Sequence, residues 1–520
     1  MISVVVPAHS VKAGPAQVLR EQDGRVSGRR DGRPVWLLLG LLLLLVGGVP
    51  VVWAGPAHAS PHHLERARNV LRYDSLVRHG SKVAAGALGP APVVHGRELA
   101  ARELLLPAGW GAGEKYPGAG LSSVACGGPQ ECVVVGSYSL GFGAPARAMV
   151  ATETNGVWGR PVAVAPRGSD GVGTALVVSC GAGKRCVVVR VAGGMRIAAD
   201  TSGVWGPSST IELPVGGALV NNGGNRAVPL GIDAVTCTGR GDCVAVGSYT
   251  SNTAGGYQAL AATETNGVWG RASEVVPPAD ATPVRGLQNA SLDAVTCTGR
   301  GACVAVGTYY DKRAMDDQGL RFMAATETGG VWGQARTIML PAWGASAALA
   351  AVRGTAFTSV SCASPRDCTA VGFYPDTQGI EDHVMAATET NGMWGRPREV
   401  MLPANADATA AGATLNAVTC TSAGNCVAVG GYAANGSTIA ANGLTTANAL
   451  SPAMIAIETH GMWRRAVEVA LPADASTQYQ TAILESVACA SQAHCVAVGG
   501  YNEEPSPPRP MVVSFALKAR

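Results

Sequence analysis

Fourteen cysteines are the residues whose spacing most restricts the chemistry of this 520-residue chain. They form seven pairs with the same spacing, Cys-x5-Cys: Cys126 and Cys132, Cys180 and Cys186, Cys237 and Cys243, Cys297 and Cys303, Cys362 and Cys368, Cys420 and Cys426, and Cys489 and Cys495. Zinc sites usually use closer pairs such as Cys-x2-Cys and join two pairs around one ion. In an oxidising compartment, regularly paired cysteines form disulfides instead. We therefore expect seven local disulfides, no metal site and no cofactor.

A second group of candidates consists of acidic residues and one histidine between the repeated motifs: Asp311, Asp316, Asp317, Asp376, Glu381, Asp382 and His383. Carboxylates from neighbouring repeats can bind calcium or a polyol. Two carboxyl groups separated by about 5–10 Å can also act as acid and base on a glycosidic bond. The alternative is that these are ordinary solvated loop charges. Repetition favours a turn-forming role for three more aspartates in "PADA"-like segments, Asp280, Asp407 and Asp474.

Other catalytic signals are missing from the sequence. It contains no Gly-x-Ser-x-Gly elbow, no HExxH and no phosphate-binding glycine loop. Six of the nine histidines precede the first cysteine pair, which leaves too few for a copper site. The net charge of +3 arises within the first 34 residues, so the remaining chain lacks the basic balance of a nucleic-acid binder. We therefore expect a protein that is not an enzyme and binds no nucleic acid.

The cysteine pairs belong to a repeat that predicts four short strands, a to d. In one repeat, strand a is "LDAVTC" (Leu292–Cys297), strand b is "CVAVGTY" (Cys303–Tyr309) and strand c is "FMAATET" (Phe322–Thr328). Strand d follows a turn such as Asn-Gly, whose two residues favour the positive φ of a type I′ hairpin. The nonapeptide "ATETNGVWG" at Ala151–Gly159 and Ala262–Gly270 spans this hairpin. Its tryptophan is expected to cover the sheet rather than to bind a ligand.

Seven such units predict an all-β fold, a seven-bladed β-propeller of four-stranded blades. The last repeat stops after strand c, and the missing strand is found before the first repeat. There "HGRELAARELLLP" (residues 95–107) aligns without gaps with "HGMWRRAVEVALP" (residues 460–472). An N-terminal strand at about 95–107 is therefore expected to complete the last blade, which removes two exposed sheet edges. The alternative is a linear array of blades or sandwiches.

The repeat resembles a known family at the end of strand b. "VAVGGY" at Val427–Tyr432 and Val496–Tyr501, followed by "ETNGVW"-type turns, resembles the repeats of the kelch/galactose oxidase-type propeller superfamily. This resemblance implies a β-propeller with a tryptophan after each c–d turn. One cysteine pair per blade is not a kelch feature and resembles repeats of exported bacterial proteins instead. The Asp-box of sialidase propellers matches poorly, since Thr154 replaces its aspartate.

The N-terminal part predicts export. Arg29, Arg30 and Arg33 precede an uncharged apolar stretch, so residues 35–55 are expected to form a transmembrane helix with residues 1–34 in the cytoplasm. The alternative is a signal sequence cleaved after Ala59. Residues 56–94 are expected to form a short stalk helix and linker, followed by the propeller at 95–520. The propeller would lie outside a cell membrane on a single-pass anchor, or be secreted.

The repeats differ mainly in their b–c and d–a connections, which emerge on the same face of a blade. Binding residues usually lie on variable loops of a rigid scaffold. The sequence therefore predicts an extracytoplasmic binding or interaction module that recognises a protein or a cell-envelope glycan through this face. Two alternatives are a glycan-active hydrolase with carboxylates at the channel mouth and a purely structural platform.

Overall fold

The computed structural model describes residues 4–5, 93–94 and 97–517. The last range has gaps at 108–117, 141–145, 165–173, 182–184, 193–195, 202–203, 206–208, 219–230, 252–255, 283–288, 313–318, 343–354, 377–381, 408–411, 435–450, 476–479 and 503–507. All regular secondary structure in these residues is β-strand. None of the described residues belongs to a helix long and apolar enough to cross a membrane. The predicted transmembrane and stalk helices lie outside the described residues.

Seven antiparallel sheets share one plan, with three long strands in sequence order. The first strands, which correspond to strand a, are β5 (Ala119–Gly128), β10 (Thr174–Gly181), β16 (Gly231–Gly239), β21 (Ala290–Gly299), β26 (Ala356–Ser364), β31 (Thr414–Ser422) and β36 (Ala482–Ser491). The second strands are β6 (Glu131–Tyr138), β11 (Arg185–Ala192), β17 (Asp242–Ser251), β22 (Ala302–Tyr310), β27 (Asp367–Pro375), β32 (Asn425–Gly431) and β37 (His494–Tyr501). The third strands are β7 (Arg147–Thr154), β12 (Arg196–Thr201), β18 (Tyr257–Thr265), β23 (Leu320–Thr328), β28 (Asp382–Thr390), β33 (Ala453–Thr459) and β38 (Arg509–Phe515).

The predicted strand d is split into two short segments that both pair with the third strand. The segments after the hairpin turn are β8 (Val157–Trp158), β13 (Val204–Trp205), β19 (Val268–Trp269), β24 (Val331–Trp332), β29 (Met393–Trp394) and β34 (Met462–Trp463). The outer segments are β9 (Val162–Val164), β14 (Ser209–Thr210), β20 (Ser273–Glu274), β25 (Arg336–Ile338), β30 (Arg398–Glu399) and β35 (Val467–Glu468). The register slips by one residue between them, because Glu264 pairs with Trp269 whereas Ala261 pairs with Ser273.

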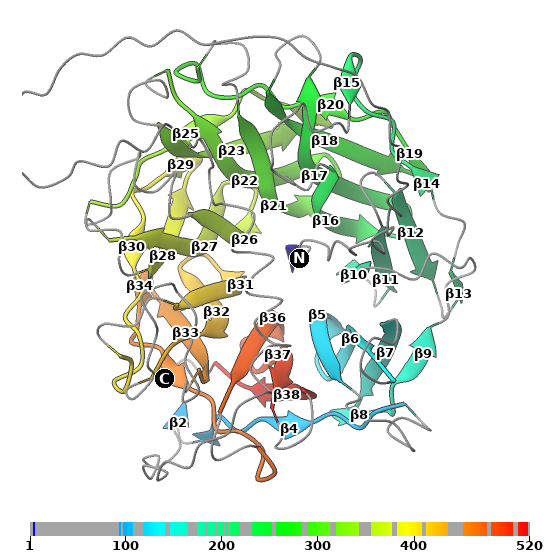
Figure 1. Cartoon of the computed structure of the whole chain (residues 1–520), viewed down its shortest axis with the longest axis vertical. Coiled ribbons are helices and arrows are strands. Elements are labelled where there is room, and N and C mark those ends of the chain that lie inside the picture. The colour runs from blue at the N-terminus through cyan, green and yellow to red at the C-terminus, as the bar shows by residue number, and fades with distance from the viewer. Residues whose placement is uncertain are drawn as a thin grey trace, which may run out of the picture. The chain divides into compact units, whose positions relative to one another are not determined.

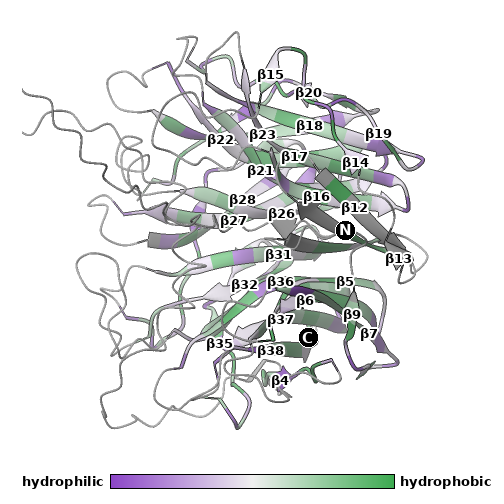
Figure 2. Ribbon diagram, turned by 45° about the vertical axis from the view of Figure 1, so that its right-hand side comes forward, coloured by the Kyte–Doolittle hydropathy of each residue, from purple (hydrophilic) through white to green (hydrophobic). Residues whose placement is uncertain are grey.

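The first strands join the sheets into a β-propeller-like arrangement. Each contacts the first strand of the next sheet, from β5 through β10, β16, β21, β26 and β31 to β36, and β36 contacts β5 again. Figure 1 shows these strands around a common centre with the other strands further out. The core lies between adjacent sheets: Phe322 of β23 packs against Phe357 of β26, with ring centroids 4.5 Å apart. Hydrophobic residues run along the long strands (Figure 2).

The last sheet is completed by a strand from before the first one, the pairing that the sequence predicts. In this sheet β4 (Arg102–Glu103) lies beside β38, with Met511 opposite Glu103. The Ala101 amide donates to the Ala470 carbonyl of the preceding sheet at 2.8 Å. Three other backbone amides donate to a carbonyl of the preceding sheet at the same distance of 2.8 Å. They are those of Ala272 to Glu212, Ala335 to Val276 and Ala466 to Met401. Residues around Ala101 therefore occupy the position of a strand d.

The seven predicted disulfides are all present, and they use all fourteen cysteines. Each joins two directly paired residues whose Cα atoms are 3.9–4.0 Å apart. The bonds link Cys126 to Cys132, Cys180 to Cys186, Cys237 to Cys243, Cys297 to Cys303, Cys362 to Cys368, Cys420 to Cys426, and Cys489 to Cys495. The expectation of one local disulfide per repeat is therefore confirmed.

Turns and disulfides lie together at one end of each sheet. The hairpin turns have the expected positive φ at both positions, for instance 53° at Asn391 and 81° at Gly392. The Gly392 amide donates to the Arg366 carbonyl of the cysteine turn at 2.9 Å. We call this the turn end.

The b–c and d–a connections meet at the opposite end, which we call the loop end. The Lys312 amide of one b–c connection donates to the Asp280 carbonyl of a d–a connection at 2.8 Å. The Asp407 amide likewise donates to the Ala433 carbonyl at 3.0 Å. The variable connections therefore contact one another, as the sequence comparison predicts.

Three further short strands accompany the seven sheets. β2 (Val93–Val94) pairs with β3 (Arg97–Glu98), and β15 (Gly217–Ala218) pairs with β17. β1 (Val4–Val5) pairs with the first strand β16, with Val4 opposite Val235.

Candidate functional site

A glycine in the second strand shapes the first strand of six sheets. A Cβ atom on Gly307 would lie 1.9 Å from the carbonyl oxygen of Ser291 in β21, which no real side chain can do. The equivalent distance is 1.8–2.1 Å at the other five glycines, Gly136, Gly247, Gly372, Gly430 and Gly499. Only glycine therefore permits this approach of the two backbones.

Opposite each of these glycines, the first strand has a β-bulge that leaves one residue out of the ladder. In β21, Leu292 pairs with Gly307 and Ala294 pairs with Val306, so Asp293 is skipped. The six skipped residues, which we call the bulge ring, are Ser122, Asp233, Asp293, Thr358, Asn416 and Glu485. Bulges are common next to active sites because they redirect a side chain. Each bulge lies near the start of its strand, toward the loop end.

Hydrogen bonds between first strands bring the bulge ring to one level. The Asn416 side-chain amide donates to the Leu484 carbonyl of the next sheet at 2.9 Å, and the Thr358 hydroxyl donates to the Leu415 carbonyl. Each acceptor is the residue directly before the next bulge. Between the last and first sheets, the Ser486 hydroxyl accepts from the Val124 amide at 3.2 Å. Neighbouring bulges are therefore held at the same height.

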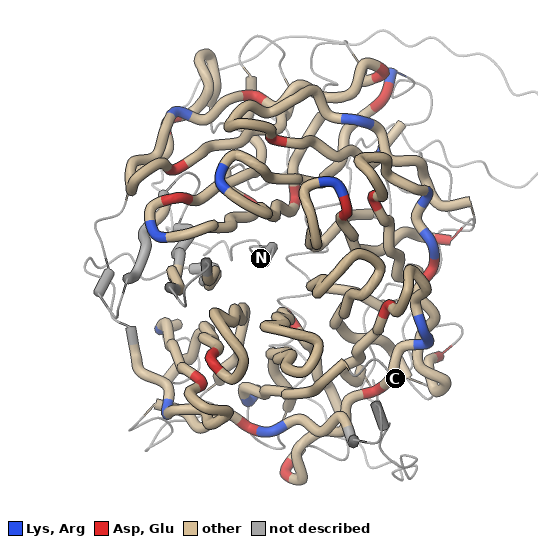
Figure 3. The backbone as a smooth tube through the Cα atoms, turned by 180° about the vertical axis from the view of Figure 1, so that it is seen from behind, with Lys and Arg blue, Asp and Glu red and all other residues tan. Residues whose placement is uncertain are grey.

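The bulge ring is acidic. Asp233, Asp293 and Glu485 are the charged residues of the seven first strands, which contain no lysine or arginine. Figure 3 shows basic residues on the outer parts and turns of the sheets. Unlike Thr358 and Asn416, an ionised carboxylate has no proton to donate to the next carbonyl.

The acidic members differ in their surroundings. Asp293 is 8% exposed and accepts a hydrogen bond from the Ser291 hydroxyl at 3.1 Å. Glu485 is exposed to solvent, but the surrounding protein displaces bulk water and raises its pKa to about 7.

The acidic residues predicted from the loops are placed differently from the expectation. Asp311 is 1% exposed, and its Oδ2 accepts from the Arg321 Nε at 3.0 Å, so it stabilises β23 beside β22. Asp311 is therefore a buried, ion-paired residue, and its part in a ligand face stays a prediction. His383 is half-buried and contacts Glu399, with 2.8 Å between Nδ1 and Oε1. Both contacts lie within single sheets.

The remaining loop candidates form no cluster among the residues that the structure describes. Asp376 is half-buried at the end of β27, and Asp382 begins β28 opposite Pro375. Asp316, Asp317 and Glu381 lie outside the described residues. The predicted ligand face therefore remains a prediction at these positions.

The recurring tyrosines and aspartates form hydrogen bonds between sheet elements. The Tyr309 hydroxyl donates to Asp280 at 2.9 Å, and the Tyr501 hydroxyl donates to Asp474 at 3.1 Å. Burial raises the pKa of both tyrosines, so they remain protonated donors. These contacts assign the tyrosines to the framework, as the repetition indicates.

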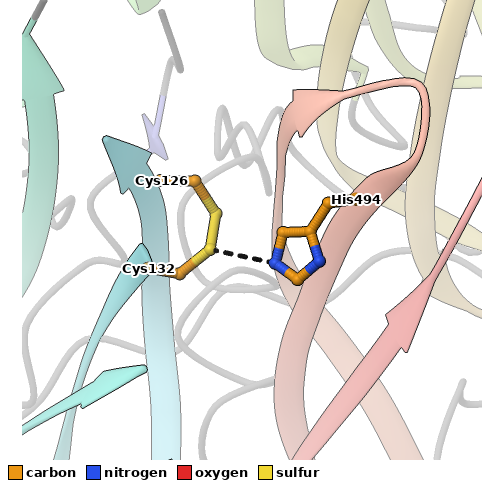
Figure 4. Close-up of side chains that lie close together, drawn as sticks. All are labelled: Cys126, Cys132 and His494. Atoms are coloured by element: carbon orange, nitrogen blue, oxygen red, sulfur yellow. Dashed lines mark hydrogen bonds between the residues drawn. A yellow bond between two sulfur atoms is a disulfide. The ribbon is translucent and has the colours of Figure 1, made fainter. Parts of the chain in front are cut away.

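Among the described residues, one group of possible metal ligands lies close enough together to hold an ion. It consists of Cys126, Cys132 and His494, with 3.6 Å between His494 Nε2 and Cys132 Sγ (Figure 4). Both sulfurs are already joined in a disulfide, which removes them as thiolate ligands. His494 Nε2 also lies 3.0 Å from Glu153 Oε2, so this histidine connects the last sheet to the first.

The bulge ring could have been recognised from the sequence. Its members stand four residues before the first cysteine of each pair, where the repeats read Ser122, Leu176, Asp233, Asp293, Thr358, Asn416 and Glu485. This position varies and is mostly polar within an otherwise apolar strand. The second repeat, with leucine there, also has Arg190 in place of the glycine, and β10 and β11 pair without a bulge.

Comparisons with known proteins place the chain in no family. A scan of known protein families finds no match, and no curated protein matches the sequence. A protein of unknown function from Dyadobacter fermentans has a TM-score of 0.37 at 11% identity, covering 81% of this chain and 99% of that one. The N11 neuraminidase-like protein of influenza A/flat-faced bat/Peru/033/2010 has 0.36 at 12%, covering 71% and 96%.

A third similar structure is the fucose-specific lectin from Aleuria aurantia, with a TM-score of 0.31 at 13% identity, covering 69% of this chain and 97% of the lectin. TM-scores below 0.5 assign neither a fold family nor a ligand to this chain. The bulge ring and its surroundings therefore carry the functional conclusion.

Proposed function

We propose that the seven sheets are the blades of one seven-bladed β-propeller, closed by the strand before the first blade. In this proposal the propeller is an extracytoplasmic binding module, held by residues 35–55 or secreted after cleavage at Ala59. Its seven disulfides suit an oxidising compartment. The ligand is a protein or a cell-envelope glycan that docks on the loop end over the bulge ring.

One observation carries this proposal. A glycine that tolerates no Cβ lies opposite each bulge, and the six bulges place serine, aspartate, threonine, asparagine or glutamate at the equivalent position. The second sheet, which has neither the glycine nor a polar residue at this position, pairs β10 with β11 without a bulge. The framework is repeated and the presented side chain is varied, which is the arrangement of a binding surface on a rigid scaffold.

The charge of the bulge ring narrows the ligand. Three carboxyl groups without a basic residue in the first strands repel an anionic glycan and attract a neutral or cationic group. Sugar hydroxyls and amino groups can donate to Asp233 and Asp293, and Asn416 supplies an amide. We therefore expect neutral or amino-sugar glycans, or a basic protein surface, to bind in preference to acidic glycans.

The experiment compares the oxidised full-length chain with a triple variant that combines Asp233→Asn, Asp293→Asn and Glu485→Gln. Both are applied to arrays of cell-envelope glycans and of envelope proteins, with fluorescence as the readout. We expect the parent chain to retain neutral or cationic ligands and the triple variant to lose them. Equal binding by the folded triple variant would exclude the bulge ring as the ligand site.

Glu485 supports a second candidate, a glycan-active hydrolase. Glu485 is the exposed carboxyl group of the bulge ring, and a raised pKa is the direction that a general acid needs near neutral pH. Such an enzyme should release reducing ends from a bound glycan and lose this activity in Glu485→Gln while retaining binding. If the parent chain binds a glycan and leaves it intact over days, the hydrolase is ruled out and the binding module stands.

A further inference from the structure

A hollow of about 350 Å³ lies between the third and fourth sheets, at the turn end and away from the bulge ring. The third sheet contributes Thr263 of β18 and Arg271, Ser273 and Glu274 around β20. The fourth sheet contributes Trp332 of β24 and its turn. Arg271 is already engaged by Glu212 in an ion pair, and Glu274 accepts from the Tyr249 hydroxyl at 2.8 Å.

A buried carboxyl group lies behind the wall of this hollow. Glu327 is 1% exposed and pairs across the hairpin with Trp332, which lines the hollow. Neither oxygen of Glu327 has a hydrogen-bond partner of good geometry, and the Trp332 ring nitrogen is also buried without one. Burial raises the pKa of Glu327, and the side chain of Thr263, another lining residue, offsets part of the increase. An unpaired carboxyl in this position is costly unless a donor or cation reaches it.

The next two junctions show which residue holds the equivalent register position. Arg336 of the fourth sheet pairs with Ala324, and Arg398 of the fifth sheet pairs with Ala386. Ser273 holds this same register position in the third sheet, opposite Ala261. The arginine found at this position in two sheets is therefore a serine beside the hollow.

These arginines act on the buried glutamates of the following sheets. Burial and the nearby Asp367 raise the pKa of Glu389 to about 7, and Arg366 and, less strongly, Arg336 offset part of this increase. Burial raises the pKa of Glu458 to about 7 as well, and Arg398 offsets part of it. In Glu389 and Glu458, one buried carboxylate oxygen lacks a hydrogen-bond partner. In Glu327, both oxygens lack one. Glu389 and Glu458 each follow a sheet with an arginine at this register position. Glu327 follows the third sheet, which has Ser273 there instead.

We propose that the hollow between the third and fourth sheets binds a guanidinium group supplied by a ligand, in the place that Arg336 and Arg398 occupy at the next two junctions. The ligand's guanidinium would lie against Glu274 and beside the indole of Trp332, whose ring adds cation–π attraction, with Glu327 buried behind it. The small side chain of Ser273 leaves the room that an arginine would fill. Guanidinium can come from an arginine side chain of a partner protein or from a free guanidino compound.

The test uses saturation-transfer NMR on the oxidised full-length chain with two probes, N-acetyl-L-arginine methylamide and free L-arginine. We expect binding in the millimolar range, which corresponds to about 4 kcal/mol. Tighter binding of the blocked probe indicates a partner polypeptide as the source, and tighter binding of free arginine indicates a small molecule. The neutral citrulline analogue, N-acetyl-L-citrulline methylamide, should not bind.

Variants make the test specific to the hollow. Ser273→Arg should fill it with the chain's own guanidinium and weaken probe binding at least about 30-fold, as expected for loss of a buried charge partner. The swap variant, Ser273→Arg combined with Arg336→Ser, should bind again, because it opens the equivalent position beside Glu389 and Trp394. No binding of either probe at about 20 mM, equal binding of the citrulline analogue, or unchanged binding by Ser273→Arg would overturn the proposal.

Discussion

The second sheet and its six counterparts carry the same disulfide but differ at the centre of the molecule. The second sheet has Arg190 where the others have glycine, and its first two strands pair in unbroken register. In the fourth sheet, Gly307 lies against the carbonyl of Ser291 and Asp293 leaves the ladder. The difference shows that one glycine decides whether a polar residue is presented at the loop end. Features that all repeats share build the framework, and the presented residue is free to vary.

The largest effect should come from closing the space beside one glycine. In Gly307→Val, the new side chain would overlap the Ser291 carbonyl, so the bulge must reorganise or the sheet must separate. We expect a loss of about 3 kcal/mol or more in the free energy of unfolding, measured by denaturant titration. The control is Gly299→Ala, whose added methyl meets nothing within 4 Å and should change stability little. Equal stability of both variants would show that the glycine does not determine the bulge.

Removing single disulfides tests whether the second sheet shares the framework of the others. Every disulfide closes a loop with a sequence separation of 6, so the chain-entropy model predicts about 2 kcal/mol for each. Replacing Cys180 and Cys186 by alanine should therefore destabilise the protein in thermal unfolding as much as replacing Cys297 and Cys303. A much smaller loss for the second sheet would mean that its regular pairing already holds the turn.

The buried glutamates in the hairpins of the fifth and sixth sheets make stability depend on pH. Burial raises the pKa of Glu389 to about 7 from a usual value near 4.5, so its protonated form is favoured in the folded state. Stability from this residue is complete below about pH 4.5 and is lost as the pH rises toward 7. Glu389→Gln should therefore be more stable than the parent at pH 8, by about 1–2 kcal/mol, and similar at pH 4.5.

The matched comparison is Glu153→Gln. Glu153 lies 3.0 Å from His494 Nε2, a partner that Glu389 does not have in the described residues. Denaturant titrations across this pH range should show no stabilisation of Glu153→Gln at pH 8. A gain as large as that of Glu389→Gln would contradict the distinction between the two junctions.

The smallest effect on stability is expected at the bulge ring itself. Asp293→Asn keeps the shape of the side chain and its contact with the Ser291 hydroxyl, so unfolding free energy should change by less than about 1 kcal/mol. Ligand retention on the arrays should nevertheless fall. A variant that loses stability but keeps its ligand would place Asp293 in the framework with Gly307.

Local signals in the sequence predict the framework well. Paired cysteines, Asn-Gly turns and the match of residues 95–107 to a strand d all act over a few residues or through direct repetition, and each corresponds to a pairing in the structure. The split of strand d was not predicted, because the one-residue slip between Trp269 and Ser273 leaves no pattern of its own.

Candidate site residues were harder to predict, because their roles depend on pairing across strands. Asp311 reads as a free loop charge until β23 brings Arg321 within 3.0 Å. Asp293 reads as one polar residue in an apolar strand until the close approach at Gly307 pushes it from the ladder. The resemblance to kelch-type repeats drew attention to the glycine as a strand end, whereas its structural role is to face a bulge.

The most direct test of the central claim asks which end of the molecule meets the ligand. A photo-crosslinking amino acid is placed at Lys312 on the loop end in one variant and at the exposed Met393 on the turn end in another, and each is irradiated in the native envelope. The account predicts a discrete crosslinked partner or glycan from Lys312, absent when the three acids of the bulge ring are replaced by their amides. Crosslinks from Met393 that persist in this triple variant, with none from Lys312, would contradict it.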